Sequence, residues 1–298
     1  PAADGSIQLP DWGPFPEPAL IERARAAGVR TILVVGTGDD ATVTANFAAL
    51  ARDNATRRAF AAQLATLVAQ HGYDGVDLDW EFPASAADRA NLTRVVIVLR
   101  DALGAGKTLS ISAPPTDDHG RWFDLPGMAP VIDWFGVMAY DLSGAGWSTI
   151  AEHNAPLYPG RSGEPSASGA VAYYLARGIP RRQILLGLPF FGQRFETATR
   201  LFQPLTPPTP GSAPDYREIA PLLGNGWTAQ RDPAAQAPYL LRDGTPGLIS
   251  YDDAGSIAAK CDYIQAQGLG GATVWSLGKD LLDGAQPLIE SVRRLRAG

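Results

Sequence analysis

A row of acidic residues in the segment 74–83 (DGVDLDWEFP) constrains the fold more than any other feature of this sequence. Asp77, Asp79 and Glu81 recur at every second position, and each is separated from the next by an apolar residue. Side chains two residues apart in a β-strand lie on the same face, so the segment predicts a strand with one acidic and one apolar face. In α/β folds, sites form at the carboxyl ends of such strands, so we expect a site here.

Crowding three carboxyl groups on one face should raise at least one of their pKa values, so that one group stays protonated and can serve as a general acid. Glu81 is last in the row and is the best-placed acid, whereas Asp77 lies deepest and contributes to the electrostatics. Two other interpretations remain open: a solvated acidic edge, and a site for a hard cation such as magnesium or calcium. The sequence contains no Asp/Asn-rich loop of the calcium-binding type.

The rest of the chain alternates short β-branched runs with helical patterns, which predicts parallel βα units and the α/β class. Either a doubly wound sheet or a (β/α)₈ barrel fits this pattern. The strands are expected at 31–36, 75–80, 109–114, 134–140, 184–190 and 272–277. The helices are expected at 19–27, 57–71, 86–103, 168–177, 256–267 and 285–296.

A barrel needs eight strands, and only six are convincing. Residues 1–18 offer one further short strand at most, at 6–9. The segment 201–214 is rich in Pro and Thr, and the pattern stays short-period as far as residue 250. We therefore expect residues 193–250 to be a small α+β insertion, and residues 1–192 with 251–298 to form the main domain.

Composition excludes several classes of function. The 298 residues carry a net charge of −6 and no run of Lys or Arg, which argues against nucleic acid or an anionic membrane as partner. No apolar stretch approaches the length of a membrane span. The single cysteine, Cys261, excludes an internal disulfide and a cysteine zinc site, and the chain has only three histidines. We expect no metal and no cofactor.

The acidic row resembles the DxxDxDxE signature of the family-eighteen glycoside hydrolases, the chitinase family, with Asp74 filling its first position. Further segments resemble other motifs of that family, in the same order along the chain. They are Met138–Asp141 (MAYD), His153–Leu157 (HNAPL), Gly187–Gly192 (GLPFFG), Tyr251–Asp253 with Ser256 and Lys260, and Gly270–Ser276 with its Trp275-Ser276 pair. An ordered set of this kind is far more specific than a single DxDxE.

The resemblance implies a (β/α)₈ TIM-type barrel, present here from about its third strand onward and lacking the first strand and most of the second. It also implies that residues 193–250 are the insertion that some members carry. We accordingly expect an incomplete barrel with unpartnered edges at 31–36 and 272–277, and an upstream segment that would complete it.

The resemblance also implies a retaining, substrate-assisted mechanism. Glu81 would protonate the glycosidic oxygen, and the substrate's own 2-acetamido carbonyl would attack the anomeric carbon. Asp79 would orient the acetamido group, Asp77 would share a proton with Asp79, and Tyr140 would donate to the acetamido carbonyl.

Four further residues are assigned to substrate binding in the same way. Trp275 would form the floor of the site, Met138 would line it, Asp141 would hydrogen-bond a sugar hydroxyl, and Trp147 would stack on a further sugar. Trp12 is a weaker candidate of the same kind.

The implied function is hydrolysis of β-1,4-linked N-acetylglucosamine polymers by a secreted monomer. Alternatives are a chitinase-like lectin without activity and an endo-β-N-acetylglucosaminidase acting on glycoprotein or cell-wall glycans. The sequence departs from the family pattern at three places. Val35–Gly38 lacks the usual Ser, Phe191 replaces a frequent Tyr, and Gln193 stands where Arg is common.

Overall fold

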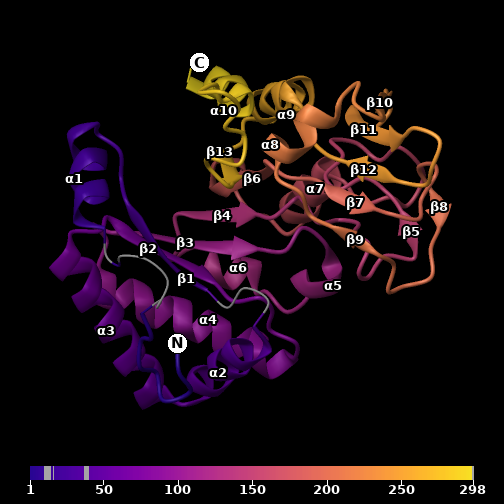
Figure 1. The fold of residues 1–298 in the computed structure, drawn as a ribbon. Coiled ribbons are helices and arrows are strands. Elements are labelled where there is room, and N and C mark those ends of the chain that lie inside the picture. Colours follow the sequence, from indigo (N-terminus) through magenta and orange to yellow (C-terminus); the bar gives the residue numbers. More distant parts are fainter. Residues whose placement is uncertain (10–14, 16, 37–39, 297–298) are drawn as a thin grey trace. The chain divides into compact units, whose positions relative to one another are not determined.

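The structure, a computed structural model, describes residues 1–9, 15, 17–36 and 40–296, and these form two compact units (Figure 1). The first unit comprises Pro1–Phe135 and Arg177–Ile179. The second comprises Gly136–Ala176 and Pro180–Gly298. The chain passes from the first unit into the second within strand β4 (Trp134–Val137).

A parallel sheet of three strands lies at the centre of the first unit, in the order β1 (Ile32–Gly36), β2 (Gly75–Asp79), β3 (Thr108–Ala113). Its register places Gly36 opposite Asp79, and Asp77 opposite Ser110. The helices of this unit are α1 (Pro18–Ala26), α2 (Ala41–Arg52), α3 (Asn54–His71), α4 (Ala86–Leu103), α5 (Asp117–Gly120) and α6 (Leu125–Met128).

Helices α2, α3 and α4 pack together on one face of this sheet (Figure 1). Helix α3 is capped at its start by Asp53, whose carboxylate accepts the Thr56 N–H at 2.8 Å, and at its end by Gly72 in the left-handed conformation. Its apolar residues recur at helical spacing, and Phe60, Leu64 and Val68 are fully buried. The helices thus pack against the apolar face of β2, and its acidic face is directed away from them.

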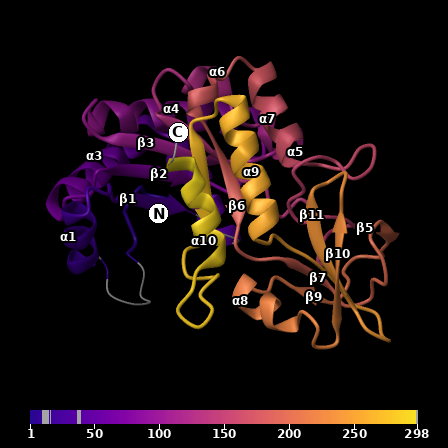
Figure 2. The ribbon, with the colours of Figure 1, turned by 90° about the horizontal axis from the view of Figure 1, so that it is seen from above.

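The second unit contains a parallel pair of strands, β6 (Ile184–Pro189) and β13 (Gly271–Trp275). Its main helices are α7 (Ala167–Ala176), α9 (Ala254–Gln267) and α10 (Pro287–Val292), with 3₁₀ turns at Arg181–Gln183, Ala220–Leu222 and Arg293–Arg296. Helices α9 and α10 run side by side (Figure 2) and share a core with β6, in which Phe190, Cys261 and Leu288 are fully buried.

Residues 193–250 form a sheet of five strands in the order β10-β11-β12-β7-β9, antiparallel throughout. The elements of this segment are β7 (Gln193–Phe195), β8 (Gln203–Pro204), β9 (Gly211–Ser212), α8 (Tyr216–Ile219), β10 (Trp227–Asp232), β11 (Ala237–Arg242) and β12 (Leu248–Ser250). Strand β8 pairs with β5 (Ile150–Ala151). In the chain, the segment lies between β6 and α9.

All six parallel strands expected from the sequence are present, each within three residues of the expected bounds. The short strand expected at residues 6–9 is wrong, because the structure places no strand there. Helix α2 was not expected. Among the described residues, β1 pairs with β2 alone, and within the second unit β13 pairs with β6 alone. Nowhere in the described ranges is a helix long and apolar enough to cross a membrane.

Candidate active site

The two faces of strand β2 differ as the alternation predicts. Val76 and Leu78 are fully buried on the face that packs against the helices, whereas Asp77 and Asp79 are half-buried on the other. Glu81 lies two residues beyond the end of the strand and is also half-buried. The three carboxyl groups are therefore grouped within the first unit.

Asp77 is held by two serines of the neighbouring strand β3. Ser110 Oγ donates to one carboxylate oxygen at 2.5 Å, and Ser112 Oγ donates to the other at 2.9 Å. Burial raises the pKa of Asp77, and these hydroxyl donors oppose that effect because they stabilise the charged form. Neither serine was singled out from the sequence, because its role depends on the pairing of β2 with β3.

Asp79 has the most strongly perturbed carboxyl group of the three. Burial first, and then the charges of Glu81 and Asp77, raise the pKa of Asp79 to about 7. Its Oδ1 is buried, and no group in the described part of the chain hydrogen-bonds it. A carboxyl group that is half protonated near neutral pH, with an open acceptor or donor position, is suited to exchange a proton or orient a polar ligand.

The backbone at Glu81 is held from helix α2. Thr44 Oγ1 donates to the Glu81 carbonyl oxygen at 2.8 Å. The next residues on either side are anchored by aromatic contacts: Trp80 stacks on Phe47 at 5.5 Å, and Phe82 stacks on His119 at 4.3 Å between ring centroids. Asp74, directly before β2, accepts the N–H of Thr31, directly before β1, at 2.8 Å, and so ties the starts of the two strands together.

The second unit carries the candidate residues of the MAYD segment, which directly follows β4. Tyr140 is half-buried, and its ring meets that of Phe191 edge-on at 5.7 Å. Gly187 of β6 lies against this ring, since a Cβ there would stand 2.8 Å from Tyr140 Cε1. Met138 is half-buried two residues before Tyr140. The Tyr140 ring is thus packed between Gly187 of β6 and Phe191, which lies two residues beyond the end of that strand.

Asp141 is exposed and has a left-handed backbone, with φ of 54°. Its N–H donates to Asn154 Oδ1 at 3.0 Å, and its carboxylate accepts from Gln193 Nε2 at 2.6 Å. Asn154 is fully buried, and its own N–H donates to Ser250 Oγ at 2.8 Å. Gln193, at the position where the sequence departs from Arg, therefore contacts Asp141 through a neutral amide. This contact between positions 52 residues apart is not predictable from local sequence patterns.

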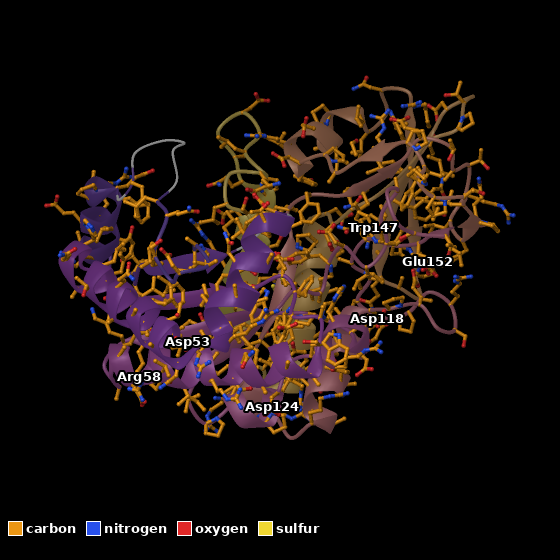
Figure 3. The ribbon with its side chains drawn as sticks, turned by 90° about the horizontal axis from the view of Figure 1, so that it is seen from below. Asp53, Arg58, Asp118, Asp124, Trp147 and Glu152 are labelled. Carbon is orange, nitrogen blue, oxygen red and sulfur yellow. The ribbon has the colours of Figure 1, made fainter. Side chains whose placement is uncertain are left out.

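Two tryptophans of the second unit present their rings to solvent. Trp275, at the end of β13, is 55% exposed, and Trp147 is 57% exposed in the loop between β4 and β5 (Figure 3). Trp147 lies against Gly144, where a Cβ would stand 2.2 Å from the indole. Exposed, flat aromatic faces of this kind match the apolar face of a sugar ring. Trp12 lies outside the described residues.

The described residues contain no group of three His, Cys, Asp or Glu side chains arranged to hold a metal ion. Cys261 is buried, and burial raises its pKa to about 11, so it is an inert thiol. A cavity of about 690 Å³ lies beside β1 in the first unit. Its lining is largely apolar, includes Leu33 and Leu64, and contains none of the candidate catalytic side chains.

The sequence of the chain is similar to those of known proteins. The sequence profile of "Glycosyl hydrolases family 18" matches residues 2–280. "Endochitinase 1" of Metarhizium robertsii is 33% identical over 278 residues, which is 88% of this chain and 64% of that protein. "Chitinase A1" of Niallia circulans is 33% identical over 292 residues, 85% of this chain and 41% of that protein. The chain thus spans less than two thirds of either relative.

Among solved structures, a Group IV chitinase from Ostrinia furnacalis matches with a TM-score of 0.87 and 25% identity, over 99% of this chain and 89% of that one. Together with the parallel strands and their helices, this match confirms the expected fold class, part of a (β/α)₈ barrel.

Proposed function

The chain belongs to glycosyl hydrolases family 18, and we propose that it hydrolyses β-1,4-linked N-acetylglucosamine polymers, chitin or chito-oligosaccharides, with retention of the anomeric configuration. The observation that carries this proposal is the carboxyl row of β2, in which Asp79 has a pKa of about 7 beside Glu81. The names of the relatives, both chitinases, support the substrate class.

In the proposed reaction Glu81 is the general acid. Its proton passes to the glycosidic oxygen as the bond from that oxygen to the anomeric carbon breaks. The carbonyl oxygen of the 2-acetamido group forms the new bond to the anomeric carbon from the opposite face, which gives an oxazolinium ion. Water then attacks the anomeric carbon, loses a proton to Glu81 and displaces the acetamido oxygen, so that the original configuration is restored.

Asp79 and Tyr140 are proposed to act on the acetamido group. Asp79 would accept its N–H and balance the positive charge of the oxazolinium ion, while Tyr140 would donate its hydroxyl to the carbonyl oxygen. Asp77 would share a proton with Asp79, and its serine donors allow it to carry charge when Asp79 is protonated. The carboxyl groups titrate as a coupled set, so their protonation adjusts as the charge on the substrate develops.

Four residues of the second unit are proposed to bind the sugar. Trp275 would stack on the ring that is cleaved and Trp147 on another, while Met138 would line the floor. Asp141 would accept from a sugar hydroxyl, because its backbone and carboxylate are both fixed by amide groups. The neutral Gln193 leaves the local charge more negative than an arginine would.

The test of this function is Glu81→Gln, assayed with a chromogenic chito-oligosaccharide. We expect hydrolysis to fall by about 10²–10⁴-fold or more while the oligosaccharide still binds, because the amide keeps the shape of the side chain and lacks the acidic proton. Glu22→Gln, at an exposed glutamate of α1, is the matched control. Normal turnover by Glu81→Gln would overturn the assignment of the acid.

A second measurement tests substrate assistance. N-acetylated oligomers should be cleaved and fully deacetylated ones should not, since a free amine has no carbonyl oxygen to attack the anomeric carbon. NMR of the first product should show the β-anomer. Equal rates on both substrates would exclude substrate assistance. Binding without cleavage by the wild type would favour the lectin, and cleavage of glycoprotein glycans alone would favour the endo-β-N-acetylglucosaminidase.

We also propose that the protein is secreted, because its polymeric substrate lies outside the cell. We further propose that it acts as a monomer. Sedimentation of the purified chain, and its distribution between culture medium and cells, would test both points.

A further inference from the structure

Helix α2 contacts the end of the acidic strand through two residues on one of its faces. Thr44 and Phe47 are three positions apart in the helix, so their side chains are neighbours. Thr44 Oγ1 donates to the Glu81 carbonyl oxygen at 2.8 Å, and Phe47 stacks on Trp80 at 5.5 Å with an angle of 12° between the rings. The two contacts fix two consecutive residues of the acidic segment.

The aromatic contact provides a rigid base for the polar one. Phe47 and Trp80 are both buried, at 0% and 1% exposure, and Phe47 also meets Phe60 of α3 edge-on at 6.0 Å. Close-packed aromatic rings of this kind hold α2 at a fixed distance from the end of β2. Thr44, one turn earlier in the same helix, is thereby carried to the Glu81 carbonyl.

The regular hydrogen bonds of the sheet do not hold the backbone of Glu81. The ladder pairs of β2 end at Asp79 with β1 and at Leu78 with β3, so the regular sheet does not extend to Glu81. A general acid must hold its proton within hydrogen-bond distance of the leaving oxygen, and a displacement of about 1 Å can cost about 10²-fold in rate. The position of the Glu81 backbone is therefore a determinant of rate.

We infer that Thr44 is a positioning residue for Glu81: its hydroxyl holds the Glu81 carbonyl so that the carboxyl group meets the leaving oxygen. This inference rests on the proposed function, because it assigns Thr44 a part in the reaction that Glu81 would catalyse. Because the Thr44 hydroxyl donates to the Glu81 backbone, we expect its loss to act on the chemical step and to leave sugar binding unchanged.

The first test is Thr44→Val, which keeps the branched shape and removes the hydroxyl. We expect kcat to fall by about 10- to 100-fold, with KM on chito-oligosaccharides unchanged within about twofold. Thr44→Ser, which keeps the hydroxyl, should recover most of the rate. The matched control is Thr66→Val in α3, whose hydroxyl bonds only to the Ala62 carbonyl one turn before it, on the exposed side of that helix.

A double-mutant cycle separates positioning from a general structural effect. If Thr44 acts through the Glu81 carboxyl group, Thr44→Val should lower the rate of the wild type and leave the residual rate of Glu81→Gln unchanged. The affinity of a chito-oligosaccharide for Glu81→Gln should be the same with and without Thr44→Val, as measured by calorimetry.

The possible results distinguish failure of the positioning role of Thr44 from failure of the proposed function. Wild-type kcat in Thr44→Val, an equal fall in the Glu81→Gln background, or a fall matched by Thr66→Val would overturn the positioning role and leave the proposed function standing. A wild type that cleaves no chito-oligosaccharide, or a Glu81→Gln variant with normal turnover, would overturn the proposed function, and the role of Thr44 in that reaction with it.

Discussion

Gly36 of β1 lies directly opposite Asp79 of β2, and a Cβ at position 36 would stand 3.0 Å from Asp79 Oδ2 and 3.2 Å from Asp79 Cβ. The perturbed carboxyl group of the candidate site is therefore in contact with the backbone of the neighbouring strand. A side chain at position 36 would therefore require Asp79 to shift by a few tenths of an ångström.

Gly36→Ala should consequently damage the site more than the fold. The new methyl group would push the Asp79 side chain aside, and we expect kcat/KM on chito-oligosaccharides to fall by about tenfold or more, with about 1–3 kcal/mol lost in the free energy of unfolding. Steady-state kinetics and urea denaturation measure the two effects. Gly106→Ala is the control, because a Cβ there meets nothing within 4 Å. Equal kinetics in the two variants would contradict the expectation.

The pKa of Asp79 predicts how stability depends on pH. In the unfolded chain this carboxyl group has its ordinary pKa near 3.8, and in the native state about 7. Between these values the native state holds more protons than the unfolded state, so this group's contribution to stability falls as pH rises from about 4 to 7 and is constant above. The full effect is at most about 4 kcal/mol, at about 1.36 kcal/mol per pKa unit.

Asp79→Asn removes this dependence. Urea denaturation at pH 4.5, 6 and 8 should show the variant gaining stability relative to the wild type as the pH rises. Asp118→Asn, whose side chain is 85% exposed (Figure 3), should run parallel to the wild type. Parallel curves for Asp79→Asn as well would mean that Asp79 ionises normally in the native protein.

A buried ion pair in the second unit predicts a large effect on stability. Lys260 Nζ of α9 donates to both carboxylate oxygens of Asp252, at 2.7 and 2.6 Å, and each side chain is 1% exposed. Ser256 Oγ donates to the same carboxylate at 2.6 Å. Because Lys260→Met would leave Asp252 buried without its cation, we expect a loss of about 3–5 kcal/mol.

The measurement is thermal or urea unfolding of Lys260→Met beside the double variant Asp252→Asn with Lys260→Met, which removes the stranded charge and should recover part of the loss. Arg293→Ala breaks an exposed pair with Glu290 and should change stability by less than about 1 kcal/mol. If Lys260→Met is as mild as Arg293→Ala, the buried pair contributes little.

The strand pattern was readable from the sequence because it depends on local alternation. The acidic and apolar faces of β2 follow from the order of residues 76–79, and the structure bears them out. Helix α2 was missed although Val43, Phe47 and Leu50 recur at helical spacing and Asp40 caps its first turn. The strand expected at 6–9 rested on alternation alone, and in the structure that segment pairs neither with the edge strand β1 nor with any other described strand.

The partners of the site residues could not be read in the same way. Ser110 reaches Asp77 only because β3 pairs with β2 in one register, and Thr44 reaches Glu81 across 37 positions of sequence. The contact of Gln193 with Asp141 spans 52 positions. Such contacts depend on tertiary packing, for which the sequence carries no periodic signal. The identity of the acidic residues was therefore predictable, and the groups that tune and hold them were not.

Removal of the Trp275 side chain should lower the affinity for a chito-oligosaccharide without lowering the stability of the fold. Its indole is 55% exposed, and the bond that fixes the end of β13 is made by its backbone carbonyl, which accepts the Phe190 N–H at 2.8 Å. Trp275→Ala keeps that bond and removes only the ring. Covering an aromatic side chain with a ligand is worth about 1.5–3 kcal/mol, so the Kd for a chito-oligosaccharide should rise by about 10- to 150-fold.

Calorimetric titration of Glu81→Gln, with and without Trp275→Ala, measures this change in Kd without cleavage. Leu277→Ala, at a neighbouring side chain that is 70% exposed, is the control. Trp275→Phe should fall between, since a smaller ring covers less of the sugar. An unchanged Kd in Trp275→Ala would remove Trp275 from the sugar site, and an unfolded variant would show that the indole serves the fold instead.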